Sequence, residues 1–526
     1  MQRLRAIDLY TVGLGAILAA AIALRLYHLG QQSLWVDELA EGTTAQAPLS
    51  QFFDDVRMDT GAAPFDYLGV KLFSSLFGHG TVGTRSWAFA LGCAGILVIY
   101  LLGSRLIRDR LVGLIAAAML AFSAFDIYYS QEARFYALAL AAGMLHLYVF
   151  LRALDSGAAR DWVLYAGVTV AALYSHYFLA ILLPIEGLYL AGAQLGPTIL
   201  NRSEHPIRLA WKQVAWCLGA QLTAVMVIVP WLLFALPSQT AGGYPTLPAL
   251  GLAKVHQIFV VLIGLAPLGS SPPAGIGQEV RTDIVLALAL VGLAWALALR
   301  QMRVLLLAGV LVLAIPVAWR SDQLGHYFWS ERQVIFILGP LYVLAAVGVR
   351  QLLGLAGSFA SNWWTRTRAG HAPNKQFAAA AVALIMAAAW VAVYWSPIKL
   401  VYQDRWLGKE DWRGVTAYID RAGCPDTQYW THLNTHYSYG FAYYDPRLLS
   451  RAHLLWRLPD GSFNTDPIVA VQRQNLGRND WIVFDSGTAS SSVGGGTVDS
   501  ALRGMGWSPT RFLGLVVYHQ ETCGTA

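Results

Sequence analysis

The chain alternates between long apolar runs and shorter polar stretches. A helix that crosses a bilayer needs roughly 20 mostly apolar residues. Eleven runs approach or reach that length: 9–29, 82–103, 111–127, 135–152, 162–175, 178–196, 214–236, 283–300, 304–319, 333–350 and 377–396. The fifth and sixth runs are short and closely joined, which leaves their division into helices open. The pattern predicts a polytopic α-helical membrane protein with about 11–13 transmembrane helices.

Basic residues set the predicted orientation, because Lys and Arg are concentrated in the cytoplasmic loops of membrane proteins. With a cytoplasmic N-terminus, the loops on that side hold most of these residues: Arg105, Arg108, Arg110, Arg152, Arg160, Arg202, Arg208, Lys212, Arg300, Arg303, Arg350, Arg366, Arg368 and Lys375. Four polar stretches then lie on the opposite side: 30–81, 128–134, 237–282 and 320–332. The sequence predicts a multi-pass topology with a working face outside the cytoplasm.

The chain becomes polar after residue 396. Residues 481–484 and 513–518 are typical of strands, and 410–419 reads as a capped amphipathic helix. The run 486–496 is rich in Gly and Ser, which predicts a mobile loop. We therefore expect a transmembrane domain over 1–396, with outside loops 30–81, 237–282 and 320–332, and a soluble α/β domain over 397–526.

Composition supports this organisation and excludes other classes. Of 526 residues, 56% are hydrophobic and only 13% are charged, too few to cover a soluble protein of this size. The net charge of +6 is spread between apolar runs and forms no basic face, so we expect no nucleic-acid partner. Cys424 and Cys523 share the polar region and could form a disulfide outside the cytoplasm, an outcome that the sequence leaves open.

The first candidate for chemistry is the adjacent pair Asp37 and Glu38, directly after the first apolar run. Desolvation near the bilayer surface raises the pKa of a carboxyl, which suits a general base. A solvated loop with two ordinary acids is the alternative.

The second candidate is the stretch 128–136 between two apolar runs. Glu132 and Tyr136 are spaced i, i+4, which predicts that they share a helix face. Ionisable groups beside membrane helices are functional candidates. Arg134 could pair with Glu132 or could hold a phosphate.

Further candidates lie in the other outside stretches. His176 lies among aromatic residues and could be a ligand or a packing residue. His326 and Arg332 precede a late apolar run, where an Arg can bind phosphate or extend toward lipid headgroups. The acids near Tyr67, among residues 54–66, could hold a divalent metal such as Mg²⁺ or Mn²⁺, or could form a solvated acidic loop.

Taken together, these stretches resemble the GT-C superfamily of membrane glycosyltransferases, in the bacterial branch related to aminoarabinose transferases and protein O-mannosyltransferases. The resemblance covers roughly residues 8–420. It rests on Leu34-Trp35-Val36-Asp37-Glu38, Ala63-Pro64-Phe65-Asp66-Tyr67, the stretch from Tyr129 to Leu138, the stretch from Tyr174 to Phe178, Glu331-Arg332, and Lys409-Glu410-Asp411-Trp412-Arg413.

The resemblance implies a GT-C fold, a sugar donor on a polyprenyl phosphate, and a cell-envelope acceptor that enters from the periplasmic side. It implies that Asp37 is the catalytic base of an inverting transfer, that Glu132 assists, and that Arg332 or Arg134 contacts the donor phosphate. The remaining substrate-binding candidates are Glu38, Tyr67, Tyr136, His176 and His326. The expected setting is a monomer in a bacterial inner membrane with a periplasmic C-terminal domain.

One departure from the family pattern concerns the stretch before the second long run. Aminoarabinose transferases carry an acid–lysine pair ahead of two prolines, whereas this chain has Gly61-Ala62-Ala63-Pro64. The change removes a phosphate-binding Lys and a possible metal ligand. Two alternatives to a single-sugar transferase are a glycan ligase or polymerase that uses a pyrophosphate-linked lipid, and a transporter of lipid-linked glycans. The acids cluster at one interface and not near the bilayer midplane, which disfavours transport.

Overall fold

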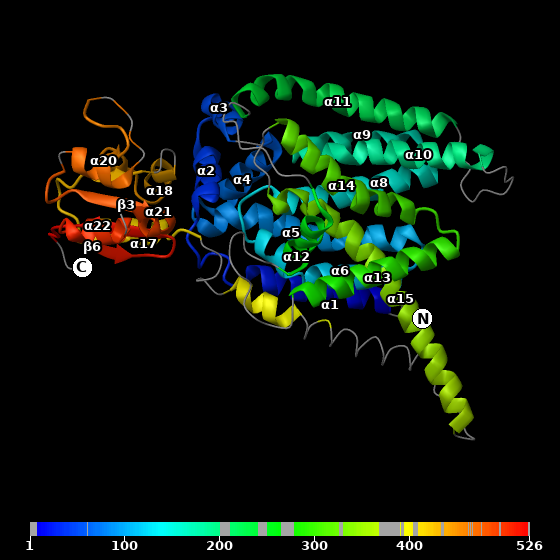
Figure 1. Cartoon of the computed structure of the whole chain (residues 1–526). Coiled ribbons are helices and arrows are strands. Elements are labelled where there is room, and N and C mark those ends of the chain that lie inside the picture. Colours follow the sequence, from blue (N-terminus) through cyan, green and yellow to red (C-terminus); the bar gives the residue numbers. More distant parts are fainter. Residues whose placement is uncertain are drawn as a thin grey trace, which may run out of the picture. The chain divides into compact units, whose positions relative to one another are not determined.

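The structure is a computed structural model, and its parts are shown in Figure 1. It describes residues 8–59, 62–199, 211–239, 250–264, 278–325, 330–367, 390, 394–402, 409–432, 436–460, 462, 464, 466–474, 476–493 and 496–523.

The chain divides into two compact units, each built from separate stretches of sequence. Unit 1 comprises Met1–Tyr27, Phe53–Gly69 and Trp87–Tyr402, and unit 2 comprises His28–Phe52, Val70–Ser86 and Gln403–Ala526. Residues 30–81, which were predicted to form one outside loop, therefore contribute to both units.

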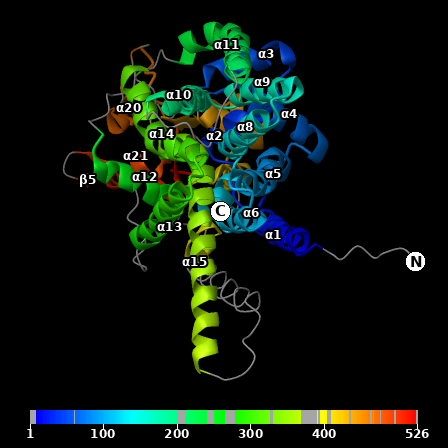
Figure 2. The same ribbon diagram turned by 90° about the vertical axis from the view of Figure 1, so that its right-hand side faces the viewer.

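Long apolar helices dominate unit 1. Within the described residues, eight segments are long and apolar enough to cross a membrane: Leu9–Leu26, Thr81–Leu106, Tyr136–Ser156, Tyr177–Gln194, Trp211–Gln239, Gln278–Ala298, Val304–Leu324 and Glu331–Ser358. The corresponding helices are α1 (Leu9–Leu26), α5 (Thr81–Leu106), α8 (Tyr136–Ser156), α10 (Leu182–Ile199), α11 (Trp211–Gln239), α13 (Gln278–Ala298), α14 (Val304–Gly325) and α15 (Leu338–Thr367). Figure 2 shows them after a 90° turn, and in both views the end of α15 extends past its neighbours in this unit.

The polytopic helical membrane fold predicted from the sequence is confirmed, and the described residues contain eight long apolar segments where the sequence suggested eleven runs. The run 111–127 is interrupted at Phe122 and Ser123, which separates α6 (Arg110–Ala121) from α7 (Ala124–Tyr129). The run 162–175 corresponds to α9 (Ala159–Leu173), which is shorter than a full membrane span. Most of the run 377–396 lies outside the described residues.

Polar stretches also contain helices that hydropathy does not reveal. The stretch 30–81 forms α2 (Val36–Gln46), α3 (Leu49–Met58) and α4 (Pro64–Phe77). The stretch 237–282 contains α12 (Leu252–Gly264), an apolar helix of 13 residues that is shorter than a full span. Pro64 begins α4, where its missing N–H costs nothing.

A five-stranded mixed sheet organises the C-terminal part of unit 2. Its strands are β1 (Tyr429–Thr431), β2 (Ala452–Leu454), β3 (Trp481–Asp485), β6 (Ser508–Arg511) and β7 (Leu515–His519), in the order β2-β1-β3-β7-β6. The pairs β2–β1 and β1–β3 are parallel, whereas β3–β7 and β7–β6 are antiparallel.

Helices surround the strands in sequence: α17 (Trp412–Ala422), α18 (His436–Tyr444), α19 (Pro446–Leu449), α20 (Pro467–Arg473), α21 (Ser486–Ser490) and α22 (Val498–Gly504). The predicted α/β domain with a capped helix near 410–419 is confirmed, since the Asp411 side chain accepts the Gly414 N–H at the start of α17. The predicted loop 486–496 is wrong. Asp485 caps α21 in this run, and β4 (Ser492–Val493) pairs with β5 (Gly496–Thr497).

Alternating side chains of β3 build two apolar cores, one on each face of the sheet. Trp481 and Val483 pack with Trp412 of α17, whereas Ile482 and Phe484 pack with Leu502 of α22. A strand buried on both faces reads as a continuous apolar run, as 481–484 does. The central strand is therefore the rigid element from which the neighbouring polar groups project.

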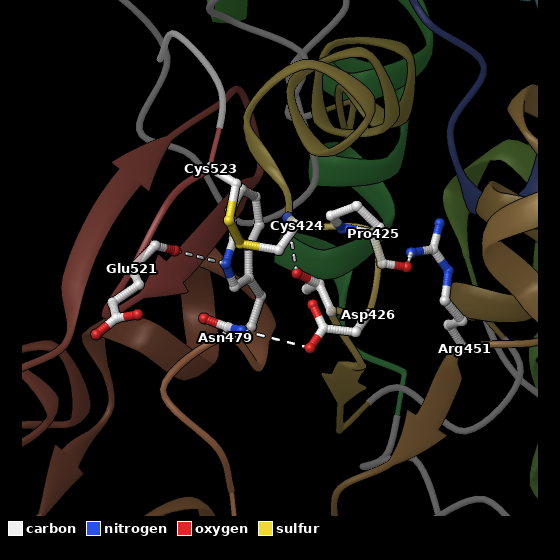
Figure 3. Close-up of a disulfide and its surroundings, with 9 residues drawn as sticks. Cys424, Pro425, Asp426, Arg451, Asn479, Glu521 and Cys523 are labelled. Carbon is white, nitrogen blue, oxygen red and sulfur yellow. Dashed lines mark hydrogen bonds between the residues drawn. A yellow bond between two sulfur atoms is a disulfide. The ribbon is translucent and has the colours of Figure 1, made fainter.

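A disulfide joins Cys424, which follows α17, to Cys523, which follows β7 (Figure 3). Their Cα atoms lie 5.0 Å apart. Around it, the Cys424 N–H donates to Thr427, and the indole of Trp481 donates to the Glu521 carbonyl. The disulfide that the sequence left open is thus present in the structure.

Candidate functional site

The first polar cluster lies in unit 2, at the start of α2. Asp37 and Glu38 occupy its first turn, where the partial positive charge of a helix N-terminus favours acidic side chains. Asp37 is partly exposed, whereas Glu38 is fully buried. Two neighbours in sequence therefore meet very different surroundings.

Two cations hold Glu38. Arg85 of α5 donates from Nε and Nη2 to the two Glu38 carboxylate oxygens, both at 2.7 Å, and Lys409 Nζ lies 3.4 Å from Oε2. The remaining Arg85 donors bond the carbonyls of Leu29, Gln32 and Ser33. This geometry makes Glu38 the anchor of the turn that holds Asp37.

Glu410 lies at the N-terminal end of α2 and was not predicted as a site residue. It accepts a hydrogen bond from the Val36 backbone N–H, and the Trp412 indole donates to it at 2.6 Å. Burial raises the pKa of Glu410 to about 7; the negative charges of Asp485 and Asp37 add to this effect, and the two hydrogen bonds oppose it. The signal available in the sequence was the polar segment 409–413, but its proximity to Asp37 requires the fold.

The other end of α2 is also held. Lys71 Nζ donates to the carbonyls of Ala45 and Ala47 at 2.8 and 2.6 Å, where the last carbonyls of the helix lack partners within it. Along the helix, Gly42 meets Tyr443, whose ring would lie 2.9 Å from an added Cβ. Both ends and one face of α2 are thus fixed, and with them the position of Asp37.

A His–Asp pair lies where the parallel strands β1 and β3 end. His432 follows β1 and Asp485 ends β3, and His432 Nε2 lies 2.6 Å from Asp485 Oδ2. Burial disfavours ionisation of Asp485, but hydrogen bonds with His432 and Thr488 outweigh it and lower the pKa of this carboxyl. The carboxyl ends of parallel strands meet at one edge of a sheet, which explains why residues so far apart in sequence are neighbours.

The second polar cluster lies in unit 1 and combines Asp59, Tyr67 and Arg134. Arg134 Nη1 lies 2.6 Å from Asp59 Oδ2 and 3.5 Å from the Tyr67 hydroxyl, which also donates to Asp59. The Arg134 side chain is almost buried, at 6% exposure, and that of Asp59 is 25% exposed. The structure therefore brings together two predicted site residues and one acid of the stretch 54–67.

Glu132 does not share a helix face with Tyr136, so that expectation is wrong. α7 ends at Tyr129 and α8 begins at Tyr136, with Glu132 in the turn between them. Phe135 takes the N-cap position of α8 and starts its hydrogen-bond ladder by accepting from Ala139. Glu132 is fully buried in this turn.

Arg332 lies beside the same turn. Its guanidinium stacks over the Tyr136 ring, 5.2 Å from the centroid, and donates a hydrogen bond to Tyr129, on which the charge of Glu132 also acts. The preceding residue, Glu331, pairs with Lys254 of α12 at 2.9 Å. Glu132 and Tyr136, predicted from the stretch 128–136, and Arg332, predicted from a separate stretch, are therefore neighbours in unit 1.

Of the two candidate histidines, only His176 lies within the described residues; His326 lies outside them. His176 is buried, and its ring lies 4.8 Å from that of Phe135. Its Nδ1 accepts the Phe178 N–H and so caps the 3₁₀ turn η1 (Tyr177–Ile181). The observed contacts of His176 are those of a packing and capping residue.

Arg25 is a buried cation of α1 that sequence reasoning did not single out. It pairs with Asp126 of α7 at 2.5 Å, and its Nε donates to Ser130 Oγ at 3.2 Å. It also donates to the carbonyls of Leu120 and Ala121. Arg25 therefore fixes the start of the turn that holds Glu132 and Arg134.

No group of three or more His, Cys, Asp or Glu side chains with the spacing of a metal site occurs in the part of the chain that the structure describes. Asp59 instead contacts a cation, Arg134, and a hydroxyl, Tyr67. The sequence left a divalent metal at this stretch as one of two possibilities, and that choice stays open; the proposed reaction uses protein groups alone.

Comparisons with known proteins bear on both units. Residues 62–234 match the family model described as dolichyl-phosphate-mannose-protein mannosyltransferase. No curated protein sequence matches the chain significantly.

Among solved structures, ArnT from Cupriavidus metallidurans in the apo state aligns with a TM-score of 0.56 at 15% identity, covering 97% of this chain and 98% of that one. The same protein bound to undecaprenyl phosphate aligns with a TM-score of 0.54 at 14% identity and covers 98% of each chain. The oligosaccharyltransferase AglB of Archaeoglobus fulgidus, in complex with an inhibitory peptide and a dolichol-phosphate, aligns with a TM-score of 0.54 at 12% identity, covering 90% of this chain and 69% of that one.

The matched segment holds the turn with Glu132 and Arg134, and the fold likeness extends over both units. Over residues 62–234 the chain is similar to the dolichyl-phosphate-mannose-protein mannosyltransferase family, and its fold is that of the membrane proteins ArnT and AglB.

Proposed function

We propose that the protein transfers a sugar from a polyprenyl-phosphate donor to a cell-envelope acceptor, with inversion at the anomeric carbon and with Asp37 as base. The observation that carries this proposal is the contrast within one helical turn. Arg85 and Lys409 hold the buried Glu38, whereas Asp37 is partly exposed at the helix N-terminus. A carboxylate in that position can accept a proton from a substrate hydroxyl.

The nature of the donor is supported by the similarity to the mannosyltransferase family and by the lipids bound to proteins of similar structure. ArnT binds undecaprenyl phosphate, and AglB has been captured with a dolichol-phosphate. We extend this ligand class to the present chain as part of the proposal. The acceptor is a glycolipid, a polysaccharide or a protein of the cell envelope.

The proposed step is a single displacement. Asp37 takes the proton of the acceptor hydroxyl, and the hydroxyl oxygen bonds to the anomeric carbon of the donor sugar. The bond from that carbon to the phosphate oxygen breaks, and polyprenyl phosphate leaves with the electron pair. Attack from the face opposite the phosphate inverts the anomeric centre.

The leaving phosphate needs a cation, and we assign this role to Arg332, with Arg134 as second choice. A preorganised guanidinium stabilises charge that develops on a leaving group. Arg332 is held by stacking on Tyr136, and Glu132 is the buried acid that assists beside it. Arg134 already has a carboxylate partner in Asp59, which a phosphate would have to replace.

Glu410 is proposed as a positioning residue for Asp37. It accepts the Val36 N–H in front of Asp37 and so fixes the start of α2. Its charge also acts on Asp37, because the two carboxyl groups interact electrostatically.

The proposed setting is a monomer in a bacterial inner membrane, with the N-terminus in the cytoplasm and the C-terminal domain in the periplasm. The distribution of basic residues supports this orientation. The disulfide between Cys424 and Cys523 supports an oxidising compartment for the domain that contains it.

The test compares envelope glycans by mass spectrometry in cells that lack the gene and carry either the wild-type chain or Asp37→Asn. Wild-type complementation should restore one species that is heavier by a single sugar, and Asp37→Asn should not restore it. Asp54→Asn, an exposed acid in an ion pair with Arg57, is the matched control and should restore it fully. Restoration by Asp37→Asn would contradict the proposed base.

The lipid product separates this reaction from that of a ligase or polymerase. Purified protein that releases polyprenyl phosphate supports the proposal, whereas release of polyprenyl pyrophosphate would assign the alternative. A mass gain of several sugars in one step would point the same way.

A further inference from the structure

A cavity of about 620 Å³ lies in unit 1, away from the residues discussed so far. Its lining residues come from the ends of α5 and α8, from the turn between α13 and α14, and from α10 and α11. The polar side chains that matter most are those of Arg108, Arg300, Arg303, Asp155 and Gln213. We call this the arginine cavity.

The charges of the arginine cavity do not balance. Asp155 pairs with Arg303, which approaches both of its carboxylate oxygens, and with Arg105 at 3.0 Å. Within the described stretches, neither Arg108 nor Arg300 has an acidic partner, and both are exposed. One carboxylate already shared by two arginines leaves a net positive cavity.

The backbone of these two arginines is unusual. Arg108 and Arg300 both have φ of +57°, in the left-handed region that L-residues avoid. The Arg300 N–H donates to Leu297 O and the Gln301 N–H to Ala296 O, a pattern that closes helix C-termini and normally places Gly at this position. A residue other than Gly in this conformation costs about 1–2 kcal/mol.

A third helix that ends near this cavity has glycine as its left-handed residue. α8 ends with Gly157, whose φ is +62°. Three helices therefore end at one cavity with a left-handed residue, one with Gly and two with Arg. Glycine would stabilise the two ends that carry Arg, so we infer that the two guanidinium groups serve a purpose other than folding.

We propose that the arginine cavity binds the phosphate of an anionic membrane lipid. Guanidinium groups match phosphate oxygens in geometry and charge and can donate two parallel hydrogen bonds. The cavity opens where membrane-spanning helices end, at the depth of lipid headgroups. Apolar lining residues, among them Leu106, Leu151 and Leu299, suit the glycerol and acyl part of a lipid better than a free ion.

The binding test uses the full chain, purified and delipidated in detergent, with native mass spectrometry as the readout. The probes are phosphatidylglycerol, phosphatidylcholine and inorganic phosphate. Wild-type protein should retain phosphatidylglycerol with at least about tenfold higher affinity than phosphatidylcholine, as expected when charge-assisted bonds distinguish the two headgroups. Inorganic phosphate at millimolar concentration should not displace the lipid.

The decisive variant is the double substitution Arg108→Gly and Arg300→Gly. Glycine suits the left-handed conformation, so the melting temperature should stay equal or rise while the preference for phosphatidylglycerol falls about tenfold. Arg160→Gln is the matched control, because Arg160 is exposed in α9 and does not line the cavity. This control should bind as wild type does.

Three results would overturn the proposal. The first is a wild-type chain that does not distinguish the two phospholipids. The second is a double-Gly variant that keeps the full preference. The third is displacement of the lipid by inorganic phosphate, which would make the cavity a site for the free ion.

Discussion

Two arginine–carboxylate pairs of this molecule differ in how completely the charges are satisfied. In unit 2, Arg85 reaches both oxygens of Glu38, Lys409 adds a second cation, and the two pair-forming side chains are 2% and 0% exposed. In unit 1, Arg134 reaches one oxygen of Asp59, and Asp59 is 25% exposed. The first pair is closed to solvent and the second is not.

The difference in solvent exposure between the two ion pairs indicates different roles. A buried ion pair with all donors engaged is costly to break, because removal of one partner leaves an uncompensated charge. A pair with one short contact at the solvent boundary can exchange its partner at little cost. Glu38 therefore fixes the turn that carries Asp37, whereas the Arg134–Asp59 pair keeps its carboxylate open to solvent.

The largest expected effect concerns the residue that Glu38 supports. Asp37→Asn should reduce transfer by about 100-fold or more, because loss of a general base removes that much rate. The melting temperature should change little, since Asp37 is partly exposed. Turnover with purified donor lipid and a thermal scan measure the two quantities. Near-normal turnover would remove Asp37 from the mechanism.

The direct test of the contrast compares Glu38→Gln with Asp59→Asn. We expect Glu38→Gln to lower the free energy of unfolding by about 3–5 kcal/mol, because Arg85 and Lys409 become uncompensated. Asp59→Asn should cost less than this, because solvent reaches Asp59 and the Tyr67 hydroxyl stays beside Arg134. Denaturant titrations in detergent give both values. Equal losses would erase the distinction drawn between the pairs.

A pH-dependent effect of intermediate size follows from Glu410. Burial raises its pKa from 4.5 to about 7, so the folded state holds a proton that the unfolded state releases between these values. Stability should therefore fall as pH rises from 4.5 to 7, by up to about 3 kcal/mol.

Unfolding measured at pH 5 and pH 8 tests this slope, and Glu410→Gln should flatten it. The pH profile of kcat/KM should also change in this variant, because Glu410 titrates near neutral pH and accepts the Val36 N–H at the start of the helix that carries Asp37. An unchanged activity profile beside a flattened stability profile would limit Glu410 to a structural role.

The smallest predicted effect concerns the phosphate contact. Arg332→Ala should raise the KM for the lipid donor about tenfold, as for loss of one charge-assisted bond. Arg320→Ala is the matched control, because Arg320 is an exposed arginine that contacts Gln323 on the same helix. Equal donor affinity in both variants would indicate that Arg332 only extends toward lipid headgroups.

Much of the fold follows from local pattern. The long helices appear as apolar runs, and α17 appears through its cap at Asp411 and its spacing of apolar residues. Hydropathy missed α2 and α3, because amphipathic helices of ordinary composition carry no membrane signal. The i, i+4 spacing of Glu132 and Tyr136 predicted that they share a helix face. Spacing alone cannot show that Glu132 lies in a turn before the helix begins.

The candidate site was predicted as separate motifs and not as an arrangement. Adjacency in sequence made Asp37 and Glu38 equivalent candidates. In the structure, Arg85 and Lys409 pair with Glu38, which distinguishes it from Asp37. Lys409 is separated from Glu38 by 371 residues. No local pattern encodes such a pairing. No local pattern encodes the contact of Glu410 with Val36 either. His432 and Asp485 become neighbours only because β1 and β3 lie side by side in the sheet.

The disulfide has a consequence for the fate of damaged molecules. Cys424 and Cys523 close a covalent ring around most of the sheet domain. A protease that cuts once within this ring leaves both fragments attached, and the strands of the sheet remain together. Release of a fragment needs a second cut or a reductant. A nicked molecule should therefore migrate as one band on a non-reducing gel and as two after reduction.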